Sequence, residues 1–143
     1  MSDYEFTTDT RRMDFAAIHG YLARSYWATG VPADVVRRAI ENSLCFAVVL
    51  DRELVGFARV VTDKATFAYL ADVFILEAHR GKGLSKRLMA FVLEHPDLQG
   101  LRRFLLATRD AHELYRRFGF KELAVPSRIM EINDPDVYRR ASA

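Results

Sequence analysis

The sequence lacks most features that mark exported or membrane-bound proteins. Its single cysteine leaves no partner for a disulfide within the chain. The N-terminal residues MSDYEF lack the basic-then-apolar pattern of a signal peptide, and no apolar run approaches the roughly 18 residues of a membrane helix. We therefore expect a cytoplasmic protein with no membrane partner. Cys45 lies in the apolar run LCFAVVL, where we expect a small buried hydrophobe rather than a nucleophile.

Several functional motifs are missing as well. A formal net charge of +2, with no basic run, argues against a nucleic-acid partner. No metal is expected, because the histidines form no H-x-x-x-H pair and no cysteine-paired set. The absence of G-x-x-x-x-G-K-[ST], G-x-G-x-x-G and G-x-S-x-G disfavours ATP, dinucleotides and a serine hydrolase. The chain length and an apolar content of 50% predict one globular domain, residues 1–143.

One segment carries a clear chemical pattern. Residues 71–93 read ADVFILEAHRGKGLSKRLMAFVL, which is a strand-like apolar run, a glycine turn and the start of a helix. Backbone N–H groups at a helix N-terminus lack intrahelical partners and can hold a phosphate. Gly81 and Gly83 have no Cβ to block its approach. The cations nearby are Arg80, Lys82 and Lys86. The segment predicts a pyrophosphate site, and the alternative is an ordinary tight turn on a solvated face.

The same segment carries a family resemblance. The run DVFILEAHRGKGLSK resembles the acetyl-CoA-binding motif of the GCN5-related N-acetyltransferases (GNAT family): Arg or Gln, two residues, Gly, one residue, then Gly or Ala. The matching positions are Arg80, Gly83 and Ser85, of which Ser85 departs from the pattern. A second family element, A-x-x-x-Y-x-x-x-G-F, matches Ala111, Tyr115, Gly119 and Phe120. The resemblance covers residues 44–122 well.

Periodicity along the chain predicts an α/β (α+β) architecture in the order β-α-α-β-β-β-α-β-α-β. The resemblance implies a single GNAT-like domain with a mixed central sheet of six to seven strands flanked by about four helices. The expected strands are 4–7, 44–50, 54–62, 66–76, 101–108 and 125–132. The expected helices are 15–26, 32–42, 84–94 and 110–118, and the tail from 134 should be frayed.

The resemblance implies acetyl-CoA (coenzyme A) as the cofactor. In the family the two parallel strands splay, and the pantetheine arm pairs with backbone at positions matching Val73 and Ile75. Thr108 stands where relatives often place Asn; its hydroxyl can still bond a cofactor amide, and Asp110 can supply part of that role. The residues expected to contact the cofactor are Val73, Phe74, Ile75, Arg80, Gly81, Lys82, Gly83, Leu84, Ser85, Lys86, Thr108 and Asp110.

The implied reaction is direct attack of a small molecule's primary amine on the thioester in a ternary complex. Tyr115 matches the family's general acid, which protonates the leaving thiolate; the alternative is a core tyrosine at helical spacing. The resemblance also implies that Tyr26 and Trp27 line the acceptor pocket together with Tyr69. The alternative for Trp27 is that it merely covers the core.

The general base is not evident in the sequence. Several relatives carry Glu on the strand before the glycine turn, at positions that here hold Tyr69 and Ala71. Asp72 should point to the opposite face, because side chains alternate along a strand. A water chain ordered by Tyr69, His112 or His19 is therefore the expected proton route.

Two further hypotheses stay open. One is an acyl-CoA-binding regulatory module with weak or no catalysis, which the missing glutamates favour. The other is acetylation of a protein or peptide amine, which a closed aromatic pocket disfavours. If the chain forms a homodimer, the edge of the expected strand 125–132 is the predicted contact.

Overall fold

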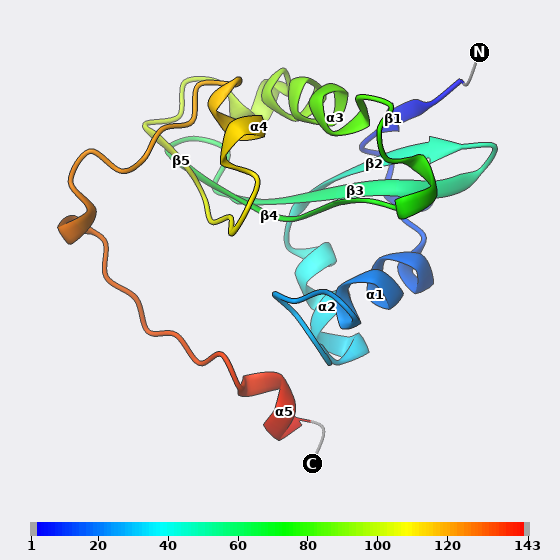
Figure 1. Cartoon of the computed structure of the whole chain (residues 1–143), viewed down its shortest axis with the longest axis horizontal. Helices are drawn as coiled ribbons and strands as arrows, with labels where there is room; N and C mark the ends of the chain where they lie inside the picture. Colours follow the sequence, from blue (N-terminus) through cyan, green and yellow to red (C-terminus); the bar gives the residue numbers. More distant parts are fainter. Residues whose placement is uncertain (1–2, 142–143) are drawn as a thin grey trace.

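The computed structural model describes residues 3–141, so the predicted domain extends two residues beyond the described part at each end. Its centre is a five-stranded sheet in the order β1-β2-β3-β4-β5 (Figure 1). β1 to β4 pair antiparallel, and β5 runs parallel to β4. The strands are β1 (Glu5–Thr7), β2 (Leu44–Leu50), β3 (Glu53–Thr62), β4 (Phe67–Ile75) and β5 (Arg103–Leu106). The mixed α/β class is confirmed.

Helices cover both faces of the sheet (Figure 1). On one face lie α1 and α2, and on the other α3 and α4. The helices are α1 (Phe15–Ala23), α2 (Ala33–Glu41), α3 (Leu84–Leu93), α4 (His112–Arg116) and α5 (Val137–Ala141). Short 3₁₀ turns lie at Thr10–Arg12, Glu77–His79, Pro96–Leu98 and Pro126–Arg128. None of the helices in residues 3–141 has the length and apolar character to cross a membrane.

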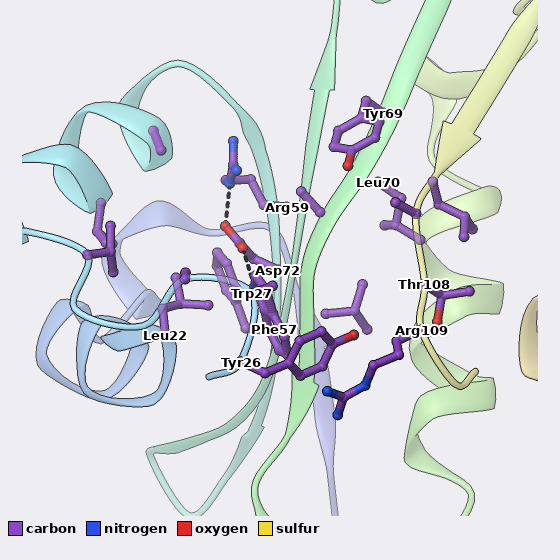
Figure 2. A pocket seen from close by; sticks show the side chains of 18 of the residues that line it. Leu22, Tyr26, Trp27, Phe57, Arg59, Tyr69, Leu70, Asp72, Thr108 and Arg109 are labelled. Carbon is purple, nitrogen blue, oxygen red and sulfur yellow. Dashed lines mark hydrogen bonds and ion pairs between the residues drawn. The ribbon is translucent and has the colours of Figure 1, made fainter. Parts of the chain in front are cut away.

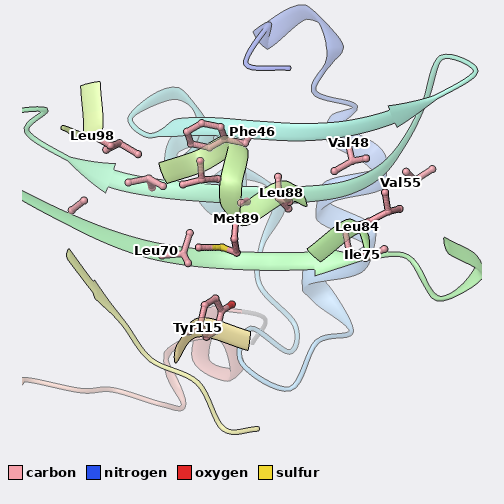
Figure 3. Close-up of a cluster of buried hydrophobic side chains, with 14 residues drawn as sticks. Phe46, Val48, Val55, Leu70, Ile75, Leu84, Leu88, Met89, Leu98 and Tyr115 are labelled. Carbon is pink, nitrogen blue, oxygen red and sulfur yellow. The ribbon is translucent and has the colours of Figure 1, made fainter. Parts of the chain in front are cut away.

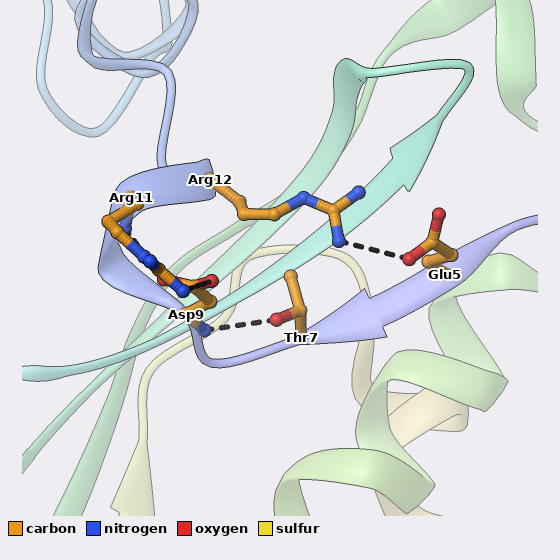
Figure 4. Close-up of polar contacts among 5 residues, drawn as sticks. All are labelled: Glu5, Thr7, Asp9, Arg11 and Arg12. Atoms are coloured by element: carbon orange, nitrogen blue, oxygen red, sulfur yellow. Dashed lines mark hydrogen bonds and ion pairs between the residues drawn. The ribbon is translucent and has the colours of Figure 1, made fainter.

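Local signals explain where the helices begin. The Asp14 carboxylate accepts a hydrogen bond from the Ala17 N–H at 3.1 Å and so caps α1. Pro32, which has no N–H to lose, stands directly before α2. The turn before α1 is tied to β1 at the surface: Arg12 donates to Glu5 at 2.9 Å, and the Asp9 N–H donates to Thr7 at 3.0 Å (Figure 4).

Each face of the sheet buries its own apolar cluster. Leu84, Leu88, Met89 and Val92 form the inner stripe of α3 and are almost fully buried against the sheet (Figure 3). The opposite cluster is formed by α1 and α2 with the other face of the sheet, and Cys45 belongs to it. Burial raises the pKa of the Cys45 thiol to about 11, which makes it a small hydrophobe, as predicted.

β4 carries a bulge opposite β3. The pairs Phe57↔Phe74 and Arg59↔Ala71 flank it, so one residue of β3 faces two of β4. Asp72, within the bulge, has a left-handed φ of 55°, which Asp tolerates better than most residues. The alternation of side chains along β4 is therefore broken at this point.

β4 and β5 separate before β4 ends. Their paired residues run from Phe67↔Arg103 to Leu70↔Leu106, whereas β4 continues to Ile75. The last half of β4 therefore has a strand neighbour only on its β3 side, and a gap opens between it and the chain after β5.

The predicted strand at 125–132 is wrong, and the sheet has five strands rather than six to seven. The segment instead contains the 3₁₀ turn Pro126–Arg128 and is exposed throughout. Pro126 cannot donate a ladder hydrogen bond, which disfavours a strand here. Within the described residues, the tail predicted to be frayed contains the short helix α5.

Candidate active site

A cleft of about 580 Å³ lies where β4 and β5 separate (Figure 2). One side is the connection between α1 and α2, and the other is the connection from β5 to α4. It brings together the residues predicted for catalysis and substrate binding, Tyr115, Tyr26, Trp27 and Tyr69, with three predicted to contact the cofactor, Val73, Thr108 and Asp110. Aliphatic side chains from α2 and Phe57 complete a mainly apolar lining.

A second cavity, of about 290 Å³, lies at the glycine turn. Gly81 and Gly83 have left-handed φ angles of 78° and 75°, and a Cβ built on either would meet open space. No side chain caps the first turn of α3. Its backbone N–H groups are therefore left for a ligand, as a phosphate site requires. The predicted residues that line this cavity are Ile75, Arg80, Gly81, Gly83, Leu84, Ser85 and Lys86.

Arg80 holds the turn in place. Its Nε donates to the Ile75 carbonyl at 2.9 Å, and its Nη2 donates to the Tyr21 hydroxyl at 2.8 Å. The Tyr21 ring stacks on Phe74 with centroids 4.0 Å apart. Arg80 thus links the turn to β4 and α1.

Two other residues of the predicted cofactor set, Phe74 and Lys82, lie outside the lining of both cavities. Phe74 belongs to the core on the α1 side of the sheet, and the Leu84 side chain is buried in the α3 core. Lys82 stands on the exposed part of the turn, outside the lining of both cavities. Because the Phe74 side chain lies in the core, any contact of Phe74 with a ligand must run through its backbone.

Tyr115 lies on α4, with 8% of its surface exposed, and lines the cleft. Burial, followed by the charges of Tyr26 and Asp110, raises the pKa of Tyr115 to about 12. The phenol is therefore protonated at neutral pH, and its O–H can be donated into the cleft.

Thr108 shapes the start of α4. Its Oγ1 accepts a hydrogen bond from the Ala111 N–H at 3.0 Å, which leaves its own O–H to donate. The helix expected over 110–118 begins after Ala111, so Asp110 lies just before it. Both Thr108 and Asp110 line the cleft.

Aromatic side chains close one side of the cleft. Tyr26 meets the Trp27 ring edge-on at 5.1 Å between centroids. The Arg109 guanidinium stacks on Tyr26 at 3.7 Å, so it joins the α1–α2 connection to the β5–α4 connection across the cleft (Figure 2). Trp27 does more than cover the core, because it lines the cleft and its Nε1–H donates to Asp72 at 2.8 Å.

The prediction that Asp72 points away from the acceptor side is wrong. Its carboxylate lines the cleft, where Arg59 Nε donates to it at 2.8 Å (Figure 2). Arg59 also donates to the Ser43 hydroxyl at 3.2 Å. The bulge in β4 is the physical reason, because one extra residue redirects every side chain that follows.

Sequence reasoning missed Asp72, Arg59 and Arg109. A signal for the first two was present: each is a charge inside an otherwise apolar strand, and buried charges need partners. The histidines proposed for the proton route lie elsewhere. His19 Nε2 bonds to the Val31 carbonyl at 2.9 Å, and neither His19 nor His112 lines a cavity described above. Residues 3–141 contain no cluster of potential metal ligands.

Comparison with known proteins gives consistent matches. Residues 9–120 match the model of the acetyltransferase (GNAT) family. A Gibberella zeae protein named "Putative acetyltransferase FG08082" is 33% identical over 144 residues, covering 84% of this chain and 80% of that protein. A crystal structure of a GNAT-family protein from Xanthomonas campestris is 50% identical, with a TM-score of 0.94, and covers 96% of this chain and 98% of its own.

The fold also recurs at low identity. A Clostridium acetobutylicum structure described as an acetyltransferase with acetyl-CoA is 12% identical, with a TM-score of 0.66, over 93% of this chain and 96% of its own. At this identity the likeness shows the fold alone.

The ion pair in the cleft is accessible to a direct stability test. Asp72→Asn keeps a side chain that tolerates left-handed backbone but leaves Arg59 without its carboxylate. We expect a loss of about 1.5–3 kcal/mol in the free energy of unfolding, measured by urea denaturation. The matched control is Asp34→Asn, which breaks the exposed Arg38 pair at 3.8 Å and should cost roughly 0–1 kcal/mol. Equal losses for the two variants would contradict a structural role for the Arg59–Asp72 pair.

Proposed function

Because the chain belongs to the GNAT family of acetyltransferases, we propose that it transfers acetyl from acetyl-CoA to the primary amine of a small molecule. Direct attack within a ternary complex is the proposed route. The observation that carries the proposal is the gap between β4 and β5. At that gap Tyr115, the β4 edge and an aromatic-lined cleft come together.

GNAT acetyltransferases use acetyl-CoA, which supplies an activated acetyl thioester, and the residues at the glycine turn fit its pyrophosphate. Gly81 and Gly83 leave the approach to the α3 N-terminus open. Lys86 lines the cavity at the glycine turn, where its positive charge favours a phosphate. The edge of β4 at Val73 lacks a strand neighbour on the gap side, so its backbone is proposed to pair with the pantetheine amides.

Tyr115 is proposed as the general acid. A buried phenol with a pKa of about 12 carries its proton at every pH at which the amine acceptor would be assayed. The neutral amine nitrogen forms the new bond to the carbonyl carbon, and the carbon–sulfur bond breaks. The phenol gives its proton to the leaving sulfur, and the proton that the nitrogen loses restores the phenol. The position of Tyr115 at the cleft, together with the glycine turn, favours an enzyme over a module that only binds acyl-CoA.

Asp72 is proposed to bind the acceptor's ammonium group before one proton leaves it to solvent and the neutral amine attacks. Its two oxygens each accept one hydrogen bond, from Trp27 and from Arg59, and these donors fix its orientation. Each oxygen keeps a lone pair for an incoming N–H donor. An ammonium held there lies on the Trp27 side of the cleft, and Trp27 and Tyr26 add an aromatic surface that favours cations.

The size and lining of the cleft support a small acceptor. A volume of about 580 Å³ falls within the range of small-molecule sites, which bury most of a ligand. Its apolar side chains from α2, among them Val36 and Ile40, suit an amine with a hydrophobic body. The Arg109–Tyr26 stack crosses and narrows the cleft, which disfavours an extended peptide as the acceptor.

Titration calorimetry tests the cofactor site. The protein should bind acetyl-CoA in preference to ATP and NAD, and Gly83→Val should abolish that binding because the side chain projects into the phosphate's approach. Gly100→Val is the matched control: Gly100 has a similar φ of 71° with open space around it but lies outside both cavities. Unchanged affinity in Gly83→Val, or equal loss in the control, would contradict the assigned site.

A second test addresses the general acid. Tyr115→Phe removes only the hydroxyl, so kcat should fall by roughly 10²–10⁴-fold while the dissociation constant for acetyl-CoA stays the same. The measurement is thiol release over a library of small primary amines, with lysine peptides in parallel. Turnover equal to the wild type would overturn the acid role. Acetylation of the peptides alone would overturn the small-molecule acceptor.

A further inference from the structure

The charged side chains of the cleft are not all paired. Those in its lining are Arg59, Asp72, Arg109 and Asp110. Arg59 and Asp72 compensate each other in the ion pair at 2.8 Å. Arg109 and Asp110 follow one another in the sequence, but within the described residues neither forms an ion pair. The cleft therefore presents one cation and one anion to whatever ligand enters it.

The Arg109 guanidinium is held in position without a polar partner. In the part of the chain that the structure describes, its side chain makes no hydrogen bond, and its ring contact is the stack on Tyr26 at 3.7 Å. Stacking uses the flat face of a guanidinium, whereas its N–H donors project from the edge. The donors are free for a ligand. Because the stack already restricts the side chain, binding a ligand there costs less conformational entropy.

The charge balance of the cleft indicates which anion Arg109 would bind. The planar fork of a guanidinium fits a carboxylate or a phosphate through two parallel hydrogen bonds. A phosphate monoester brings nearly two negative charges at neutral pH. Arg109 is the one unpaired cation in the lining, and Asp110 next to it is an unpaired anion. A singly charged carboxylate therefore fits better than a phosphate.

Arg109 and Asp72 lie at opposite ends of an aromatic pair (Figure 2). At one end, Trp27 donates to the Asp72 carboxylate at 2.8 Å. At the other, Tyr26 carries the Arg109 guanidinium on its face. The Trp27 and Tyr26 rings meet at 5.1 Å between centroids. A ligand that reaches both charges must span this pair, which an α-amino acid cannot do because its ammonium and carboxylate sit on the same carbon.

We propose that Arg109 determines acceptor specificity and that the acceptor is an ω-aminocarboxylate. The acceptor's carboxylate binds the Arg109 guanidinium, its ammonium binds Asp72, and its apolar spacer lies along Trp27 and Tyr26. This inference rests on the proposed acetyl transfer and names its class of amine. Contacts to the remote carboxylate orient the amine before it attacks. The acetylated product has no ammonium left for Asp72, which favours its release.

Ligand binding in the absence of turnover is the first test. Trp27 is the single tryptophan of the chain and lines the cleft, so its fluorescence reports on binding there. The probes are the ω-aminocarboxylates from β-alanine to ε-aminocaproate, each compared with its primary amide. At the best length the acid should bind roughly 10–100-fold more tightly than its amide, as expected for a charge-assisted hydrogen-bonded pair.

Variants assign this preference to one side chain. Arg109→Gln should remove the difference between acid and amide, and Arg109→Lys, which keeps the charge but not the fork, should retain part of it. Arg102→Gln is the matched control, because it removes an exposed cation outside both cavities, and it should bind like the wild type. Equal binding of acid and amide by the wild type, or no binding by any acid of the series, would overturn the proposal.

Thiol release in the presence of acetyl-CoA separates this inference from the proposed function. Arg109→Gln should raise KM for the acid by roughly 10–100-fold, while kcat and the dissociation constant of acetyl-CoA stay unchanged. Acetylation of acid and amide with equal kcat/KM, or best activity with glycine, would refute the role of Arg109 and leave acetyl transfer standing. Binding that depends on Arg109, but without thiol release from any amine, would refute acetyl transfer and leave the carboxylate site standing.

Discussion

The separation of β4 from β5 is the constraint on which the rest of the structure depends. Pairing between them stops at Leu70 and Leu106, although β4 continues to Ile75. The gap creates the cleft, exposes one backbone edge of β4, and lets the chain after β5 place Tyr115 at the cleft. A fully paired sheet would fill this space with side chains and backbone hydrogen bonds, and no ligand could reach the phenol.

The bulge in β4 adds a second constraint, because it determines which charges face the gap. One extra residue in β4 brings Asp72 to the cleft in a left-handed conformation. Arg59 and Trp27 then donate hydrogen bonds to the Asp72 carboxylate. The Arg59–Asp72 ion pair compensates two charges that would otherwise be buried without a partner in apolar strands. The same contacts fix Trp27, an exposed aromatic residue, in the lining. The Arg59–Asp72 ion pair therefore has a structural role and also a proposed role in binding the acceptor.

Features set by local sequence were predictable, and features set by distant pairing were not. Neighbouring residues were enough to predict the glycine turn and the starts of the helices at residues 15 and 84, where α1 and α3 begin. The orientation of Asp72 depended on how β4 pairs with β3, and alternation alone gave the wrong face. The strand expected at 125–132 has apolar residues but no neighbouring strand within the chain, and Pro126 interrupts it.

A crystal structure of the protein with coenzyme A bound tests the central claim most directly. The account predicts the pyrophosphate against the backbone N–H groups from Gly81 to Lys86, pantetheine along the open edge of β4, and the sulfur within hydrogen-bond reach of the Tyr115 hydroxyl. Coenzyme A bound elsewhere, or bound at the glycine turn with its sulfur directed away from Tyr115, would contradict it.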